Sequence, residues 1–285
     1  MRPGLAEEAG SGRWHGLEVD VCRAVAAAVL GSPDRIAFQS YETPKEFDAV
    51  REGRDDVFFL TGMEIHAQSL AGRVLPGPTV YVESHAVLVP ASSPALRVQD
   101  LSGRSVCYVI GTSAERSLSA YFDGAGGTFL RRPFSEEGEM TDAYNAQSCH
   151  GVAGERTTLA SYRLSGGVNR LESRILPDTL SAFPIVAATG VDDVRWAQVV
   201  AWTVATLVSG ERPETRWYAG GSGAMPIVGS EMGLDASWQR RVLAAVGHYG
   251  DVFDRNLGRG SRLGLERGLD ANALHGGLML SPFRE

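Results

Sequence analysis

The stretch at residues 105–115, SVCYVIGTSAE, decides the fold class that this sequence predicts. Its first six residues are mostly β-branched or aromatic and predict a strand at 105–110. Gly111 then breaks the strand. Thr112 and Ser113 are residue types favoured where helices begin, so a helix is expected at about 114–122. A strand, a tight turn and a helix in this order form the repeating unit of α/β proteins.

The same alternation runs through the rest of the chain. Strands are expected at 35–41, 56–60, 83–89, 105–110, 128–131, 150–153, 174–176 and 185–189, and helices at 17–30, 43–52, 114–122, 136–146, 155–164, 194–209 and 237–249. A chain of 285 residues is long enough for two ordinary domains, and we interpret the pattern as two α/β units. Residues 256–285 are rich in glycine and are expected to form an ordered wrap of loops.

Composition and charge exclude several classes of protein. The formal net charge is −7, so the chain lacks the basic face that nucleic-acid binding needs. No apolar run is long enough to span a bilayer, and the N-terminus shows no basic start followed by an apolar stretch. The three cysteines and six histidines have no metal-binding spacing, so neither a metal ion nor a cofactor is expected.

Candidate binding residues follow from the strand ends, because ligands of open α/β sheets bind at the carboxyl ends of strands. This rule selects Thr61 and the turn formed by Gly111, Thr112 and Ser113. The turn offers N–H groups, hydroxyls and a helix dipole to a ligand carboxylate; alternatively, its hydroxyls only cap the helix. Glu155 lies at another strand-to-helix turn, where it could bind a ligand ammonium or stabilise its own helix.

Several segments resemble one family, the general amino-acid-binding proteins of ABC importers within the polar amino-acid solute-binding family. They are WHGLEVDVCRAVAAA at 14–28, SVCYVIGTSAE at 105–115, ILP at 175–177, WQRRVLAAVGHYGDVFDRNLG at 238–258 and LERGLDANALHGGLMLSPFR at 265–284. The resemblance is collinear and covers nearly the whole chain.

The resemblance implies a type II periplasmic-binding fold with two lobes. Lobe one would comprise residues 1–90 and 186–285, and lobe two residues 91–185. Two crossover strands, near 87–91 and 183–187, would form the hinge. By this resemblance the protein captures a small polar ligand, an amino acid or a related compound, between its lobes and catalyses nothing. It would be a periplasmic monomer that presents its ligand to a membrane permease.

The resemblance also assigns residues to the pocket. Thr112 and Ser113 match the family's carboxylate-binding turn, and Tyr81 matches its tyrosine before the hinge. Glu155 stands where the family has an aspartate that binds the ligand ammonium, and Gln68 stands where it has an arginine that binds the ligand carboxylate. A neutral amide does not replace a bidentate guanidinium.

Three readings of this altered pocket stay open. The ligand is not a standard α-amino acid, or Gln68 and His66 hold it differently, or binding is weak. The segment VESH at 82–85 also departs from the family's polar and aromatic residues at these positions.

Two further expectations rest on the resemblance. Family cysteines at the positions of Cys107 and Cys149 lie on neighbouring segments of lobe two, which predicts a disulfide between them, and Cys22 is expected to be a buried thiol. The family has a leader and a first β-strand before the segment that matches residues 2–4. We therefore expect a late-assigned start or a truncated chain.

Two other functions compete with the receptor. The same fold hosts cyclohexadienyl dehydratases, and Glu155 or Glu83 could supply the acid that such an enzyme needs. A diverged paralogue that senses or binds without transport is the third candidate, favoured by Gln68 and by the missing strand.

Overall fold

The structure is a computed structural model that describes residues 2–10, 12–41, 48–50, 52–164, 171–212 and 229–280. In chain order its strands are β1 (Glu7–Glu8), β2 (Trp14–His15), β3 (Phe58–Thr61), β4 (Leu75–Pro90), β5 (Ser105–Val109), β6 (Leu130–Phe134), β7 (Gly151–Glu155), β8 (Ser173–Ile175) and β9 (Ser181–Thr189). Its α-helices are α1 (Leu17–Leu30), α3 (Gly62–Leu70), α4 (Ser113–Gly124), α5 (Glu137–Asn145), α6 (Arg156–Tyr162), α7 (Val194–Ser209), α8 (Trp238–Val246) and α9 (Tyr249–Asn256). Short 3-10 helices lie at Val98–Leu101, Gly229–Met232, Gly268–Asp270 and Ala273–His275.

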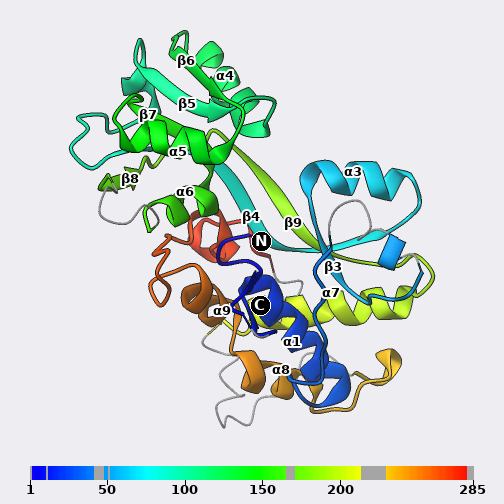
Figure 1. The fold of residues 1–285 in the computed structure, drawn as a ribbon. Coiled ribbons are helices and arrows are strands. Elements are labelled where there is room, and N and C mark those ends of the chain that lie inside the picture. Colours follow the sequence, from blue (N-terminus) through cyan, green and yellow to red (C-terminus); the bar gives the residue numbers. More distant parts are fainter. Residues whose placement is uncertain are drawn as a thin grey trace.

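One seven-stranded sheet runs through the molecule in the order β3-β9-β4-β7-β5-β6, with β8 paired to β4. Strand β4 is 16 residues long and connects the two halves of this sheet. It pairs antiparallel with β9 from Leu75 to His85, and with β7 from His85 to Leu88. In Figure 1, β4 and β9 run side by side between the upper body and the rest of the molecule.

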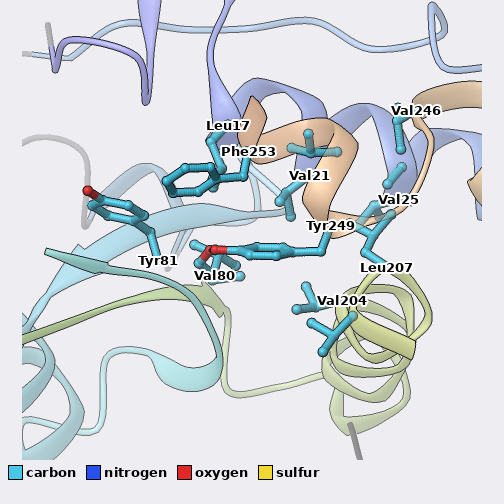
Figure 2. Close-up of a cluster of buried hydrophobic side chains, with 14 of the residues drawn as sticks. Leu17, Val21, Val25, Val80, Tyr81, Val204, Leu207, Val246, Tyr249 and Phe253 are labelled. Carbon is cyan, nitrogen blue, oxygen red and sulfur yellow. The ribbon is translucent and has the colours of Figure 1, made fainter. Parts of the chain in front are cut away.

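The elements gather into two bodies, which we call lobe one and lobe two. Lobe one contains α1, α3, α7, α8, α9 and β3, and lobe two contains α4, α5, α6 and strands β5 to β8 (Figure 1). The core of lobe one is a large apolar cluster in which Tyr249 and Phe253 of α9 pack against Leu17 and Val21 of α1 and Val204 of α7 (Figure 2).

The sheet of lobe two is covered by apolar side chains on both faces. Successive side chains of a strand point to opposite faces, and β4 accordingly sends Val87 and Val89 into one apolar cluster and Leu88 into another. Strand β5 likewise places Tyr108 in the first of these clusters and Cys107 in the second. Helix α6 also reaches lobe one, because Ala160 packs into the core of that lobe.

The structure corrects the expected strand at 35–41. Residue 35 forms a bend and residues 36–41 are irregular backbone, and no strand lies beside them within the described ranges. A β-rich pattern becomes a strand only where another strand supplies ladder partners. The expected helix at 43–52 falls largely outside the described residues, although residues 48–50 are helical.

Two helical segments also differ from expectation. The expected helix at 237–249 is two helices, since Gly247 adopts a φ of 76° and ends α8 before α9 begins. Helix α3 was not expected. Its sequence signal is Thr61 followed three residues later by Glu64, a capping box that the structure forms.

Candidate functional site

The candidate site lies at the edge of lobe two where two strands end. Strands β5 and β7 are parallel neighbours, so their carboxyl ends meet there. Helix α4 begins at Ser113 and α6 at Arg156, directly after these strands. His85 of β4 is the cross-strand partner of Glu155, and its ring contacts Ser113. The structure thus brings the predicted turn and Glu155 to one place, where His85 is a neighbour of both.

Most polar groups of the turn are already bonded within the chain. The Gly111 N–H donates to Glu115 Oε2 at 2.7 Å, and the Thr112 hydroxyl donates to the Val109 carbonyl at 2.7 Å. Thr112 also accepts from the Glu115 N–H at 3.4 Å, so it is a helix cap as well as a candidate ligand contact. The Glu115 carboxylate thus accepts from an N–H group that the sequence assigns to a ligand carboxylate.

Glu155 is half-buried at the end of β7. No described residue forms a hydrogen bond with its carboxylate, which leaves the carboxylate open to a ligand ammonium. Burial raises its pKa; the Arg2 charge opposes this shift, whereas Glu137 and Glu64 add to it. A bound ammonium would lower that pKa again.

The candidate binding residues of lobe one, Thr61 and Gln68, do not form hydrogen bonds with those of lobe two among the described residues. The Thr61 hydroxyl donates to Glu64 Oε2 at 2.7 Å in the capping box of α3. Gln68 lies farther along α3, and its Oε1 atom is buried without a hydrogen-bond partner in the part of the chain that the structure describes. No contact among the described residues joins Thr61 or Gln68 to the turn at Gly111.

Tyr81 is buried on β4, where it pairs with Ile185 of β9. Its ring lies at the margin of the lobe-one core (Figure 2). Burial raises its pKa well above the usual value, and the nearby Glu83 and Asp270 add to this effect. Tyr81 therefore stays protonated, and it lies where β4 leaves lobe one.

Sequence reasoning missed an ion pair whose arginine acts electrostatically on Glu155. Arg2 Nη2 lies 2.7 Å from the carboxylate of Glu18 on α1, and Glu18 is 2% exposed. Burial raises the pKa of Glu18 to about 7, Arg2 opposes the shift, and Glu64 adds to it. The available signal was a carboxylate inside the apolar run LEVDV at 17–21.

The crossing segment of β4 contains a second buried carboxylate. Glu83 accepts from the Thr157 hydroxyl at 2.5 Å and from the Ser84 N–H at 2.8 Å, and burial raises its pKa to about 7. These bonds are made to residues of the hinge and of α6. Glu83 thus stabilises the crossing strand, and its carboxylate is already committed.

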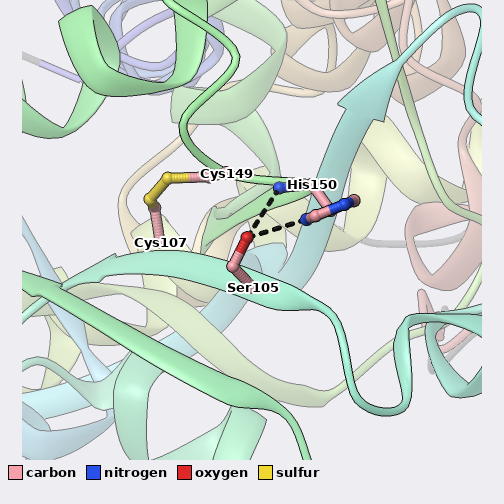
Figure 3. Close-up of a disulfide and its surroundings, with 4 residues drawn as sticks. All are labelled: Ser105, Cys107, Cys149 and His150. Carbon is pink, nitrogen blue, oxygen red and sulfur yellow. Dashed lines mark hydrogen bonds between the residues drawn. A yellow bond between two sulfur atoms is a disulfide. The ribbon is translucent and has the colours of Figure 1, made fainter.

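The predicted disulfide between Cys107 and Cys149 is present. It joins β5 to the residue before His150, with Cα atoms 5.8 Å apart (Figure 3). Cys22 is a free, buried cysteine, as expected, and burial raises its pKa to about 12. The described residues contain no cluster of side chains suited to a metal ion. Among the described helices, none has the length and apolar character needed to cross a membrane.

Known proteins are similar in sequence to almost the whole of this chain. The general L-amino acid-binding periplasmic protein AapJ of Rhizobium johnstonii is 30% identical over 98% of this chain and 86% of its own. The glutamate/glutamine/aspartate/asparagine-binding protein BztA of Rhodobacter capsulatus is 28% identical over the same shares. No protein-family profile matches the sequence.

A solved structure of a periplasmic binding protein is also similar to this chain. A periplasmic binding protein from Brucella ovis with glutathione bound superposes with a TM-score of 0.76 at 27% identity, covering 99% of this chain and 92% of that one. The fold and the binding relatives define a two-lobed solute-binding protein of type II. The chain belongs to the family of periplasmic amino-acid-binding proteins of ABC transporters. The predicted fold and the predicted solute-binding role are confirmed at this level.

Proposed function

We propose that this protein is the periplasmic receptor of an ABC importer and binds an amino acid or an amino-acid-derived peptide such as glutathione. One observation carries the proposal: the N-terminus of α4 lies at the same edge of lobe two as the Glu155 carboxylate, to which no described residue is hydrogen-bonded. A helix N-terminus suits a carboxylate and a carboxylate suits an ammonium, so the pair is complementary to a zwitterion.

The second half of the site comes from lobe one in this proposal. Arg2, Glu18 and Glu64 lie close enough to influence one another or Glu155 electrostatically. The division is the one the family implies, with residues 1–90 and 186–285 in lobe one and 91–185 in lobe two, except that Val87, Leu88 and Val89 at the end of β4 pack in lobe two. A ligand that contacts both lobes binds the closed form better, and this difference in affinity shifts the population toward closure.

The proposal includes the partner and the chemistry. A membrane permease recognises the closed form, the receptor acts as a monomer, and no reaction is catalysed. The bonds of Glu83 to Thr157 and Ser84 argue against its use as a catalytic acid. The relatives that support the proposal are binding proteins.

A thermal-shift panel of the twenty amino acids and glutathione tests this function. A receptor is stabilised by a free energy that rises with the logarithm of ligand concentration over Kd and is about 2.7 kcal/mol at a hundredfold excess over Kd. We expect a concentration-dependent rise in Tm with at least one compound of the panel. If every compound left Tm unchanged at millimolar concentration, the proposed function would be wrong.

A further inference from the structure

His85 sits in a closed ring of polar contacts at the hinge. Its Nε2 lies 3.1 Å from Ser113 Oγ, and its Nδ1 lies 2.7 Å from Ser181 Oγ and 3.1 Å from Ser117 Oγ. The residue is 2% exposed, and its ring lies 5.2 Å from that of Phe183. These neighbours come from α4 and β9, so His85 connects the ligand turn to both crossing strands.

The protons of this ring can be assigned by counting donors. The Ser117 hydroxyl donates to the Ser113 carbonyl at 2.9 Å, so Ser117 Oγ must accept in its 2.8 Å contact with Ser181. The Ser181 hydroxyl therefore donates its only proton to Ser117 Oγ, and Ser181 Oγ accepts from the His85 Nδ1–H. A neutral imidazole has one donor and one acceptor. His85 Nε2 is therefore the acceptor, and the Ser113 hydroxyl points its only proton at it.

This assignment has a consequence for the ligand. While His85 is neutral, the Ser113 hydroxyl cannot donate to a ligand carboxylate, because its proton is already used. A proton added at Nε2 reverses that bond: His85 donates to Ser113 Oγ, and the Ser113 hydroxyl is free to donate to the ligand. The same proton places a positive charge beside the N-terminus of α4.

We propose that His85 is the cationic anchor of this binding site and that a ligand carboxylate is bound together with one proton taken up by His85. This inference rests on the proposed function and names the residue that supplies the positive charge of the site. It selects ligands that carry a carboxylate. Ser113 is the group that touches the carboxylate, and His85 orients and charges it.

The charged groups near His85 come from four elements. Helix α4 contributes Arg116 and Glu115, β7 contributes Glu155 as the cross-strand partner, and β4 contributes Glu83 two residues away on the same face. Helix α6 contributes Arg156, which donates to the hydroxyl of Ser84, the neighbour of His85 in β4. The neighbours on β9 are a hydroxyl and a phenyl ring, neither charged. Burial, and then Arg116, lower the pKa of His85 in the free protein. A bound carboxylate has the opposite effect.

The direction of the pH dependence follows from linkage. Because the bound form holds one more proton at His85, affinity for a carboxylate ligand rises as pH falls, approaching about tenfold per pH unit where His85 is neutral in the free protein and protonated in the complex. Glu155 responds in the opposite sense, since a bound ammonium lowers its pKa and releases a proton. Comparison with a variant at position 85 separates the two contributions.

Calorimetry provides the test. L-Glutamine, with one carboxylate, is titrated between pH 6 and 8 in phosphate and in Tris, whose different ionisation enthalpies report the protons taken up. Glutathione is the second probe, and L-glutaminamide is the ligand control without a carboxylate. The variants are His85→Gln and, as a matched control, His150→Gln. His150 Nδ1 lies 2.8 Å from Ser105 Oγ at the opposite edge of lobe two (Figure 3).

We expect proton uptake and tighter binding at pH 6 for the wild type and for His150→Gln. The His85→Gln variant should bind more weakly without the pH dependence, and L-glutaminamide should bind weakly at every pH. If proton uptake by the wild type does not exceed that of His85→Gln, the role of His85 is wrong and the receptor function stands. Failure of the wild type to bind any compound of the panel overturns both. If His85→Gln does not fold, Glu155→Gln keeps the test intact: it has no carboxylate at position 155 to release a proton, so binding of L-glutamine to it without proton uptake overturns the role of His85.

Discussion

At the scale of single residues, the site depends on which polar groups are already bonded. Gly111 and Thr112 bond within the chain, whereas no described residue bonds the Glu155 carboxylate. Glu155 could be selected from the sequence because it follows a strand and opens a helix. His85 could not, because its role depends on serines 28, 32 and 96 positions away that only the fold brings together.

The Glu155→Gln substitution tests the ammonium contact. It keeps the size of the side chain but removes the charge, so the loss should match a charge-assisted hydrogen bond, about 1.5–3 kcal/mol or roughly 10- to 150-fold in Kd. Calorimetry with the best ligand of the panel measures this change. Glu139→Gln, which removes an exposed acidic side chain of α5, should bind normally. Equal affinities for the two variants would contradict the assigned role of Glu155.

At the scale of elements, the crossing strand β4 is held by buried carboxylates. Glu83 bonds Thr157 and Ser84, and Asp270 accepts from the Val82 N–H at 2.7 Å. Val82 lies opposite Pro184 of β9, which has no N–H to offer the ladder. Side-chain carboxylates thus supplement the sheet bonds at the hinge, and their burial links the stability of the fold to pH.

The pH dependence of stability has a defined sign. Glu83 has a pKa of about 7 in the folded protein against 4.5 as its ordinary value, so the folded state binds its proton more tightly. The stabilisation is complete below pH 4.5 and is lost as pH rises through 7, at most about 3 kcal/mol for this group. In urea denaturation at pH 5 and 8, Glu83→Gln should lose less stability than the wild type over this interval. Identical losses would show that Glu83 is not responsible.

The disulfide acts on lobe two alone. It closes a loop with a sequence separation of 42 residues. On the chain-entropy account, a loop of this length is worth about 4 kcal/mol. A Cys107→Ala/Cys149→Ala protein should unfold at lower urea concentration than the wild type and show no response to reductant, while the Kd for ligand changes little. If reductant left the wild-type midpoint unchanged, the bridge would not contribute as stated.

At the scale of the whole molecule, the sequence predicted the elements that depend on local pattern. It missed features that depend on neighbours distant in the chain. Helices at 17–30 and 194–209 appear with the expected bounds, because their apolar periodicity and end signals are local. Residues 35–41 have the composition of a strand, but no described strand pairs with them. The two-lobed periplasmic-binding fold and the disulfide came from resemblance, which carries long-range information that periodicity lacks.

Closure of the two lobes around a ligand is a change of the whole molecule and can be measured in solution. A ligand held between the lobes should reduce the radius of gyration in small-angle X-ray scattering, because the closed form is more compact. Glu155→Gln at the same ligand concentration should show a smaller reduction. A wild-type radius that stays constant at saturating ligand would argue against a bridging ligand and in favour of binding to one lobe.

The contact between Asp270 and Val82 spans 188 positions of the chain. The Tyr249 hydroxyl, which donates to the Val80 carbonyl at 2.9 Å, spans another 169. Neither bond can form until Tyr249 and Asp270 have left the ribosome. Lobe two, made from one continuous stretch, can fold earlier, whereas the bonds that secure the hinge wait for these two residues. A nascent chain stalled before residue 249 would therefore carry a folded lobe two on an unsecured hinge.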